Sequence, residues 1–271
     1  LFAKKSIPVT AFWVADTARR FPEIVREMES AGHETGTHSL YHETVGDSLF
    51  EIPGTYPLLP EEVQPRIKLA TDILEDIVGH KVVSWRCPRL FGGTHVTNAL
   101  EALGYECDAT YPMYFYNEQL FPYHPSQENW TEQGSLNLIE IIQFADMGME
   151  SKDDYGRDKD QWPLYRTQST EAFIPHIESF MSYLEKNDQS QKPIVLCFYF
   201  HPWEFWEMPE GVIHFGEGGV LPDPFLTKGC GKYCLNQVEL LIDWLKSKEA
   251  AFLTAGQCAR KWHEILALQE I

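Results

Sequence analysis

Basic residues are scarce in this sequence. It has 22 lysines and arginines against 40 aspartates and glutamates, which gives a formal net charge of −18 at pH 7. A surface of this sign repels phosphate groups, so the composition argues against a nucleic-acid or anionic-membrane partner. An uncharged polymer, such as a sugar chain, is compatible with it.

Long apolar runs are also missing. No stretch reaches the roughly 18 apolar residues that a membrane-spanning helix needs, and the longest run, residues 194–200, has the length of a strand. The sequence has no secretory signal pattern and no initiator Met, and its first residues, Leu1 to Lys5, resemble the end of an amphipathic helix. We therefore expect the sequence to begin inside a domain.

Cysteine is infrequent, with six residues among 271. These residues lack the paired spacings of a zinc finger, so we expect reduced thiols in or near the core. Cys230 and Cys234 lie four residues apart, and a disulfide or a metal half-site at this pair is the alternative.

The sequence does have a regular alternation of strand-like and helix-like segments. A chain of 271 residues that is 44% hydrophobic suits one domain, residues 1–271, with a large core. The alternation predicts a parallel sheet or an α/β barrel. Residues 147–168 are Asp-rich and irregular, and we expect an exposed insertion there. We expect strands at residues 8–15, 82–86, 105–109, 136–143, 194–200 and 251–254, with a short strand or loop at 33–38. We expect helices at 17–32, 60–78, 96–103, 171–186, 235–248 and from 256 onward.

Two histidines follow the second predicted strand. His38 and His42 end the segment Gly32-His-Glu-Thr-Gly-Thr-His-Ser-Leu-Tyr-His42. On a helical turn this spacing places both imidazoles on one face, where they can bind one cation such as zinc. Histidine pairs at this spacing are more often ordinary surface residues, so the pair alone does not establish a metal site.

Two further polar residues end predicted strands. Arg86 can hold a carboxylate through two hydrogen bonds, and a structural ion pair is the alternative. His201 can act as a general acid near neutral pH, with Trp203 as an apolar wall, and a buried histidine bonded to the backbone is the alternative. In α/β barrels the active site forms at the carboxyl ends of the strands, which is where both residues fall.

The order of these motifs resembles that of the NodB-homology polysaccharide deacetylases (carbohydrate esterase family four), in particular a branch with a His-Pro-Trp-Glu ending. Residues 32–42 resemble the family's metal motif, His-Ser/Thr-x-x-His. Arg86-Cys-Pro resembles its Arg-x-Pro motif, and Phe200-His-Pro-Trp-Glu204 the segment that bears its catalytic histidine. The resemblance covers nearly the whole chain. It implies an irregular TIM-like (β/α)7 barrel in which His38 and His42 bind a divalent metal, with zinc as the favoured metal.

The sequence departs from this family in one respect. The family's first strand carries an Asp pair, in which one Asp binds the metal and the other acts as base, and nothing like it precedes Pro8. We expect that strand, and with it the third metal ligand, upstream of Leu1. A substitute carboxylate is the alternative, and the candidates are Asp16, Asp146 and Glu204.

The resemblance implies a hydrolase that removes N-acetyl groups from an amino-sugar polymer or oligomer. It also implies that Arg86 orients the base and that His201 protonates the leaving amine. Trp203, Phe91 and Tyr41 are candidates for stacking on a sugar ring. An allantoinase-type ring-amide hydrolase and a non-catalytic carbohydrate-binding relative are the alternatives, and a homo-oligomer is compatible with the sequence.

Overall fold

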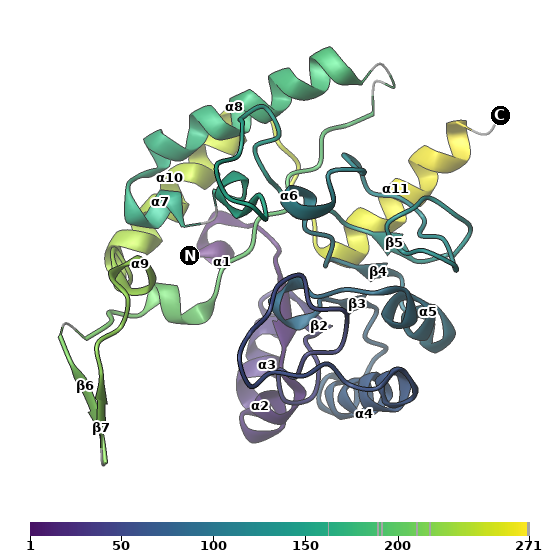
Figure 1. Ribbon diagram of the computed structural model, residues 1–271, viewed down its shortest axis with the longest axis horizontal. Coiled ribbons are helices and arrows are strands. Elements are labelled where there is room, and N and C mark those ends of the chain that lie inside the picture. The colour runs from purple at the N-terminus through teal and green to yellow at the C-terminus, as the bar shows by residue number, and fades with distance from the viewer. Residues whose placement is uncertain (162, 189, 191, 210, 217, 270–271) are drawn as a thin grey trace. The chain divides into compact units, whose positions relative to one another are not determined.

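The structure is a computed structural model that describes residues 1–269 with the exception of residues 162, 189, 191, 210 and 217. The chain forms two compact units (Figure 1). One, called here the sheet unit, comprises Phe2–Gln143, Pro193–Cys197 and Phe252–Ile271. The other, called here the helical unit, comprises Leu1, Phe144–Lys192 and Phe198–Ala251.

The sheet unit is built on a parallel sheet in which the order of the strands is their order in the sequence. Its strands are β1 (Thr10–Trp13), β2 (Glu34–Thr37), β3 (Ser84–Trp85), β4 (Cys107–Asp108) and β5 (Ile139–Glu140). The predicted parallel α/β fold is confirmed. Among the described residues the ladder runs from β1 to β5, and a single bridge from Gln143 to Cys197 continues it beyond β5.

Helices connect the strands and cover both faces of the sheet. The helices of this unit are α1 (Phe2–Lys5), α2 (Ala15–Arg20), α3 (Pro22–Ser30), α4 (Pro60–Val78), α5 (Thr94–Leu103), α6 (Met113–Tyr116) and α11 (Ala255–Gln269), with a 3-10 turn at Pro88–Leu90. Helix α4 begins with proline at its first position and is capped after Val78 by Gly79, which has a φ of 77°. Its residues Val63, Ile67, Ala70 and Leu74 are buried at helical spacing.

Alternate residues of the strands pack on opposite faces. Trp85 and Leu138 pack with residues of α4 and α5, which lie side by side in Figure 1. Cys107 and Ile139 pack instead with Trp262 of α11. Burial of each large apolar side chain contributes about 1.5–3 kcal/mol relative to exposure, so both faces stabilise the sheet.

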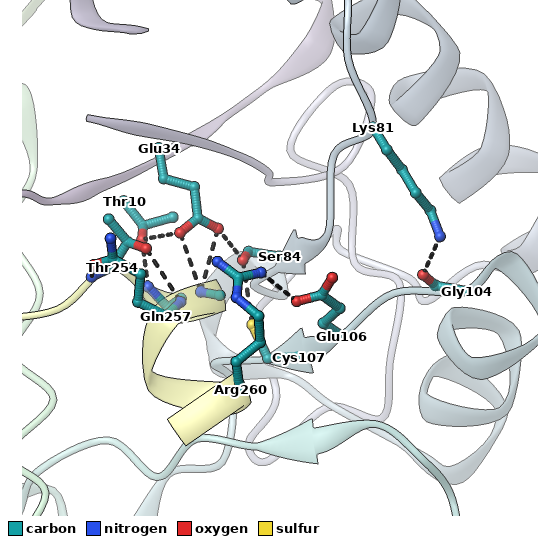
Figure 2. Close-up of polar contacts among 12 residues, drawn as sticks. Thr10, Glu34, Lys81, Ser84, Gly104, Glu106, Cys107, Thr254, Gln257 and Arg260 are labelled. Atoms are coloured by element: carbon teal, nitrogen blue, oxygen red, sulfur yellow. Dashed lines mark hydrogen bonds and ion pairs between the residues drawn. The ribbon is translucent and has the colours of Figure 1, made fainter. Parts of the chain in front are cut away.

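The first turn of α11 closes the amino end of the sheet (Figure 2). The backbone N–H of Ala255 donates to the Thr10 hydroxyl at 2.7 Å, and that of Gly256 donates to the Glu34 carboxylate at 3.1 Å. Ser84, at the start of β3, also donates its hydroxyl to Glu34. Because these groups satisfy one another at the amino ends of the strands, the carboxyl ends are the place to look for a site.

The helical unit contains helices, short 3-10 turns and one hairpin. The elements are η2 (Arg157–Lys159), α7 (Leu164–Thr167), α8 (Thr170–Asn187), η3 (Pro202–Phe205), β6 (Ile213–Phe215), β7 (Gly218–Val220), α9 (Pro224–Thr227) and α10 (Lys232–Ser247). Within the predicted insertion at 147–168, Tyr165 and Arg166 are buried. All six cysteines of the chain are free thiols. No described helix has the length and apolar character needed to cross a membrane.

Three predicted elements were wrong. The helix expected at 17–32 is two helices, because Pro22 cannot continue the hydrogen bonding of α2 and instead opens α3. Residues 194–200 form one isolated bridge rather than a strand buried on both faces, and Ile194 is 38% exposed. Residues 251–254 form no strand. Thr254 accepts from the N–H of Gln257 and donates its own N–H to the Gln257 side chain, which is a capping box for α11.

Candidate metal and catalytic site

The carboxyl ends of β2 and β3 bring two predicted site residues to one edge of the sheet. Trp13, Thr37 and Trp85 are aligned across β1, β2 and β3. The backbone N–H of His38 donates to the Trp13 carbonyl at 2.8 Å, and that of Arg86 donates to the Thr37 carbonyl at 3.0 Å. Strand-like hydrogen bonding therefore fixes the backbone of both His38 and Arg86.

The two histidines are in contact. Their ring centroids are 5.0 Å apart, with an angle of 69° between the ring planes. The backbone between them is not the predicted helical turn, because Ser39 and His42 both have a φ of 62°. Left-handed backbone costs about 1–2 kcal/mol for such residues and persists only where the surroundings enforce it. The rings thus meet through a constrained loop.

The ring of His38 is oriented by the strand beside it. Its Nδ1 lies 2.8 Å from the carbonyl oxygen of Arg86. A carbonyl oxygen can only accept, so Nδ1 carries a proton, and in the neutral ring the lone pair is on Nε2. Donation of the second ring N–H to a backbone carbonyl is the usual way in which proteins orient a metal-binding imidazole.

Two charged residues brace the loop that carries His42. Arg89 donates to the carbonyl of His42 at 3.1 Å and to the hydroxyl of Thr44 at 3.3 Å. Glu43 accepts from the Tyr41 N–H at 2.6 Å and lies 3.6 Å from Arg66 of α4. The backbone at Gly46 passes so close to the carbonyl of Phe91 that an added Cβ would lie 2.2 Å from it. The loop of residues 38–46, called here the histidine loop, therefore packs directly against the Arg86–Phe91 segment.

The imidazole pair fits two positions of a transition-metal site. Imidazole nitrogen suits zinc, His38 is half-buried, and His42 is exposed to an incoming ion. Catalytic zinc sites use three protein ligands. Among the described residues, no group of three His, Cys, Asp or Glu side chains is arranged to hold a metal, so the pair needs a further protein ligand.

Arg86 is held from several sides. Its Nε donates to the Ala109 carbonyl at 2.8 Å, and a terminal nitrogen donates to the side-chain oxygen of Gln143 at 3.1 Å. Its guanidinium lies 4.6 Å from the centre of the Phe12 ring. Gln143 in turn donates to the same Ala109 carbonyl at 2.7 Å. These contacts fix the guanidinium plane at the carboxyl edge of the sheet.

His201 belongs to the helical unit, where it precedes η3. A buried carboxylate holds it: Glu204 accepts from the N–H of His201 at 2.7 Å and lies 3.3 Å from its Nδ1. The ring stacks on Trp203 with 5.5 Å between centroids, and 46% of the side chain is exposed. Glu204 also accepts from Tyr165 at 2.7 Å and pairs with Arg166 at 3.2 Å.

The three carboxylates considered as a substitute base all have close partners. Asp16 pairs with Arg19 and Arg20 at 2.7 Å, and the hydrogen bond from Arg19 lowers its pKa. Asp146 is buried and lies 2.7 Å from Nδ1 of His176. Glu204 is fully buried against Arg166. Each of the three carboxylates is therefore engaged with a structural partner.

The three aromatic candidates differ in exposure. Tyr41 is 60% exposed, and Trp203 is half-buried against His201. Phe91 is 1% exposed, and its ring packs edge-on against Phe50 at 5.1 Å. Phe91 therefore packs beneath the surface against the histidine loop, and its ring has no exposed face on which a sugar could stack.

Three residues of the site escaped prediction from the sequence. Gln143 ends the predicted fifth strand, and a polar residue at that place could have been recognised as a site candidate. Arg89 and Glu43 lie inside the motifs already noted, but their contacts depend on left-handed residues at His42 and Arg89, which sequence patterns do not reveal.

The fold and this site define a parallel α/β protein with a histidine pair and an arginine at the carboxyl edge of its sheet. Residues 1–107 match the sequence model of the polysaccharide deacetylase family. No match was found among curated proteins.

The fold is shared with solved structures, among them the following two. The chain is similar to a probable polysaccharide deacetylase from Pseudomonas aeruginosa PAO1, with a TM-score of 0.60 and 18% identity over 97% of this chain and 70% of that chain. It is similar to the Puue allantoinase, with a TM-score of 0.59, 18% identity and the same coverage, 97% and 70%. At these identities the likeness concerns the fold.

Proposed function

We propose that this protein is a metal-dependent hydrolase that removes N-acetyl groups from an amino-sugar polymer or oligomer, and that it belongs to the His-Pro-Trp-Glu branch of the polysaccharide deacetylases. The observation that carries the proposal is the contact between His38 and His42, with Nδ1 of His38 bonded to the Arg86 carbonyl. The match of residues 1–107 to the deacetylase family supports it independently.

The proposed metal is zinc, with His38 and His42 as two of its ligands. A bound divalent cation would supply Lewis-acid polarisation of the acyl carbonyl. The Arg86 carbonyl holds His38 in the tautomer that presents Nε2, and Arg89 holds the backbone of His42. The third ligand and the catalytic base are expected from an Asp-bearing strand outside this pair.

The proposed roles of the remaining residues follow from their chemistry. The fixed guanidinium of Arg86 orients the carboxylate base through paired hydrogen bonds. His201, whose Nδ1 faces Glu204, protonates the leaving amine through its other nitrogen. Tyr41 and Trp203 offer ring faces to a sugar, whereas the buried Phe91 acts by supporting the loop.

Metal content and deacetylation together test the proposal. Purified protein should bind zinc on titration, and zinc-loaded protein that also carries the Asp-bearing strand should release acetate from N-acetylated chitooligosaccharides. H38A and H42A should lose both properties. H80A is the matched control, because His80 is also exposed and pairs with Glu29, away from the site. Wild-type protein that binds no divalent metal under any condition would exclude the proposal.

The second candidate is a ring-amide hydrolase of the allantoinase type, which the equal likeness to an allantoinase fold favours. Metal-free protein that hydrolyses allantoin would support it over the deacetylase. The third candidate is a carbohydrate-binding relative without activity, which the lack of a third ligand among the described residues favours. Binding of chitooligosaccharides by zinc-loaded protein without any release of acetate would support it.

A further inference from the structure

Two carboxyl side chains lie next to each other inside the sheet unit. Asp108 of β4 and Glu140 of β5 are register partners on adjacent parallel strands, so both side chains project from the same face. Neighbouring strands are about 4.8 Å apart, which brings the two carboxyl groups within reach of each other. Neither residue is exposed to any extent.

Each carboxyl group has one oxygen with partners and one without. Oδ1 of Asp108 accepts from the Thr110 hydroxyl. Oε1 of Glu140 accepts from the backbone N–H groups of Thr110 at 3.1 Å and Tyr111 at 2.7 Å. Oδ2 of Asp108 and Oε2 of Glu140 are buried, and neither has a hydrogen-bond partner among the residues that the structure describes. Two fully ionised carboxylates in this arrangement would leave two buried charges facing each other.

The groups around the pair do not supply two positive charges. The cation whose field reaches Asp108 is Arg86. The other titratable groups near the pair are thiols and phenols, none of which carries a positive charge, and Cys197 is one of them. Burial raises the pKa of five of these groups, so these five stay neutral at pH 7: Cys87, Cys107, Tyr111, Tyr116 and Tyr123. One guanidinium can balance one carboxylate but not two.

We propose that Asp108 and Glu140 form a buried proton-binding site, in which one proton is shared between the two carboxyl groups, and that the singly charged pair positions Arg86. The shared proton lies between Oδ2 and Oε2 and satisfies both. The functional part of this inference rests on the proposed function, whereas the proton site itself does not.

The connection to Arg86 runs through short hydrogen bonds. The Thr110 hydroxyl that donates to Asp108 accepts from the backbone N–H of Cys87, the residue after Arg86, at 2.9 Å. Glu140 holds the N–H groups of residues 110 and 111, directly after Ala109, whose carbonyl accepts from the Arg86 guanidinium. Asp108 and Glu140 are therefore positioning residues: Asp108 holds the backbone that follows Arg86, and Glu140 holds the segment whose carbonyl binds the Arg86 guanidinium.

The direction of the pH effect follows from burial. Desolvation raises the pKa of Asp108 to about 7 and, together with the charge of Asp108, raises the pKa of Glu140 well above its usual value. The folded protein then binds a proton that the unfolded chain, with carboxyl pKa values near 4, has already released. Stability from this site is complete below about pH 4 and declines as the pH rises through the raised values.

The experiment measures the free energy of unfolding of the wild-type protein and of E140Q from pH 4 to pH 9. The amide introduced by E140Q would keep an oxygen for the two backbone N–H groups and would donate its NH2 to Oδ2 of Asp108, as the shared proton does. In the wild type the unfolding constant should rise by up to tenfold per pH unit over part of this range, and E140Q should lose that rise. E61Q, the same change at an exposed glutamate of α4, should keep the wild-type slope.

A second measurement covers the case in which E140Q does not fold. Infrared spectroscopy of the wild-type protein at pH 7 should show the carbonyl stretch of a protonated carboxylic acid, and D108N should alter it. Absence of this band, or equal pH slopes in the wild type and E140Q, would overturn the proton site. Stability that depends on the cation present and not on pH would overturn it in favour of a bound cation.

The positioning role has its own readout. If the protein deacetylates chitooligosaccharides, E140Q should move the alkaline limb of the pH–rate profile to higher pH. A profile unchanged in E140Q, together with an altered stability slope, would restrict the pair to a structural role. Inactive wild-type protein would count against the proposed function, and the stability and infrared measurements would still decide the proton site.

Discussion

Glu34, at the start of β2, accepts a hydrogen bond from the backbone N–H of Gly256, which lies 222 residues further along the chain. The same carboxylate accepts from Thr10 at 3.4 Å and from Ser84, so it joins the first three strands to the first turn of α11 (Figure 2). A carboxylate at a helix N-terminus is also favoured by the helix dipole. Glu34 is therefore the residue that closes the amino end of the sheet.

Replacement of Glu34 should destabilise the sheet unit. E34A removes the acceptor for at least two hydroxyl or N–H groups in a half-buried position, and each buried group left unsatisfied costs about 1–3 kcal/mol. We expect a loss of about 2–6 kcal/mol, measured by urea unfolding. The loss should appear without any change in metal affinity, because the site lies at the opposite ends of the strands.

Glu106 supplies the control, since it lies in the same region and pairs with Arg260 at the surface (Figure 2). Exposed ion pairs contribute about 0–1 kcal/mol, so E106A should change stability by less than E34A does. Equal losses in the two variants would contradict the role assigned to Glu34.

Much of the fold could be predicted from the sequence, because local signals and the final fold agree there. Helix α4 has proline at its start, glycine after its end and apolar residues at helical spacing, and it lies where the pattern predicts. The run at 194–200 was misread because a continuous apolar stretch does not reveal how many neighbours it will have. The capping box at Thr254 was readable but competed with an apolar triplet that suggested a strand.

A methyl group at Gly46 should disturb the site more than the fold. Its Cβ would lie 2.2 Å from the Phe91 carbonyl and 2.4 Å from the Gly92 carbonyl, and backbone cannot move aside as a flexible side chain can. In G46A the histidine loop and the Arg86–Phe91 segment must separate. We expect a loss of about 1–3 kcal/mol in stability and at least a roughly tenfold weaker zinc affinity by titration calorimetry.

The control for this change is G54A. Gly54 has a φ of 75° and open space around it, so alanine there meets only the backbone strain, about 1 kcal/mol. Zinc affinity should stay at the wild-type value in G54A. A parallel drop in zinc affinity in both variants would mean that general loop stability, and not the contact with Phe91, is responsible.

The site was less predictable than the fold. The spacing of His38 and His42 suggested their proximity, yet the loop between them uses left-handed residues at Ser39 and His42 in place of a helical turn. Asp108 and Glu140 looked like ordinary strand residues, because their pairing arises only from the register of β4 against β5. Long-range register is set by the packed fold and leaves no local trace in the sequence.

The buried pair of Glu204 and Arg166 should be costly to break. Both side chains are fully buried, with 3.2 Å between the atoms, and Arg166 also donates to the carbonyls of Lys228 and Phe225. E204A leaves an uncompensated buried charge, so we expect a loss of about 3–5 kcal/mol in thermal or urea unfolding. D72A, which breaks the exposed pair with Lys68, should cost far less.

The role of Arg89 can be separated from that of Arg86 by replacing it alone. Arg89 donates to the carbonyl of His42 and to Thr44, and it contacts neither imidazole in these bonds. R89A should release the strained backbone at His42 and weaken zinc binding by about 10–100-fold, as changes to groups behind metal ligands commonly do. Stability should fall by no more than about 1 kcal/mol, because the side chain is partly exposed.

The control is K68A, which removes a surface pair with Asp72 on α4 and should leave zinc affinity unchanged. Undiminished zinc binding in R89A would show that the loop holds His42 in place without this arginine.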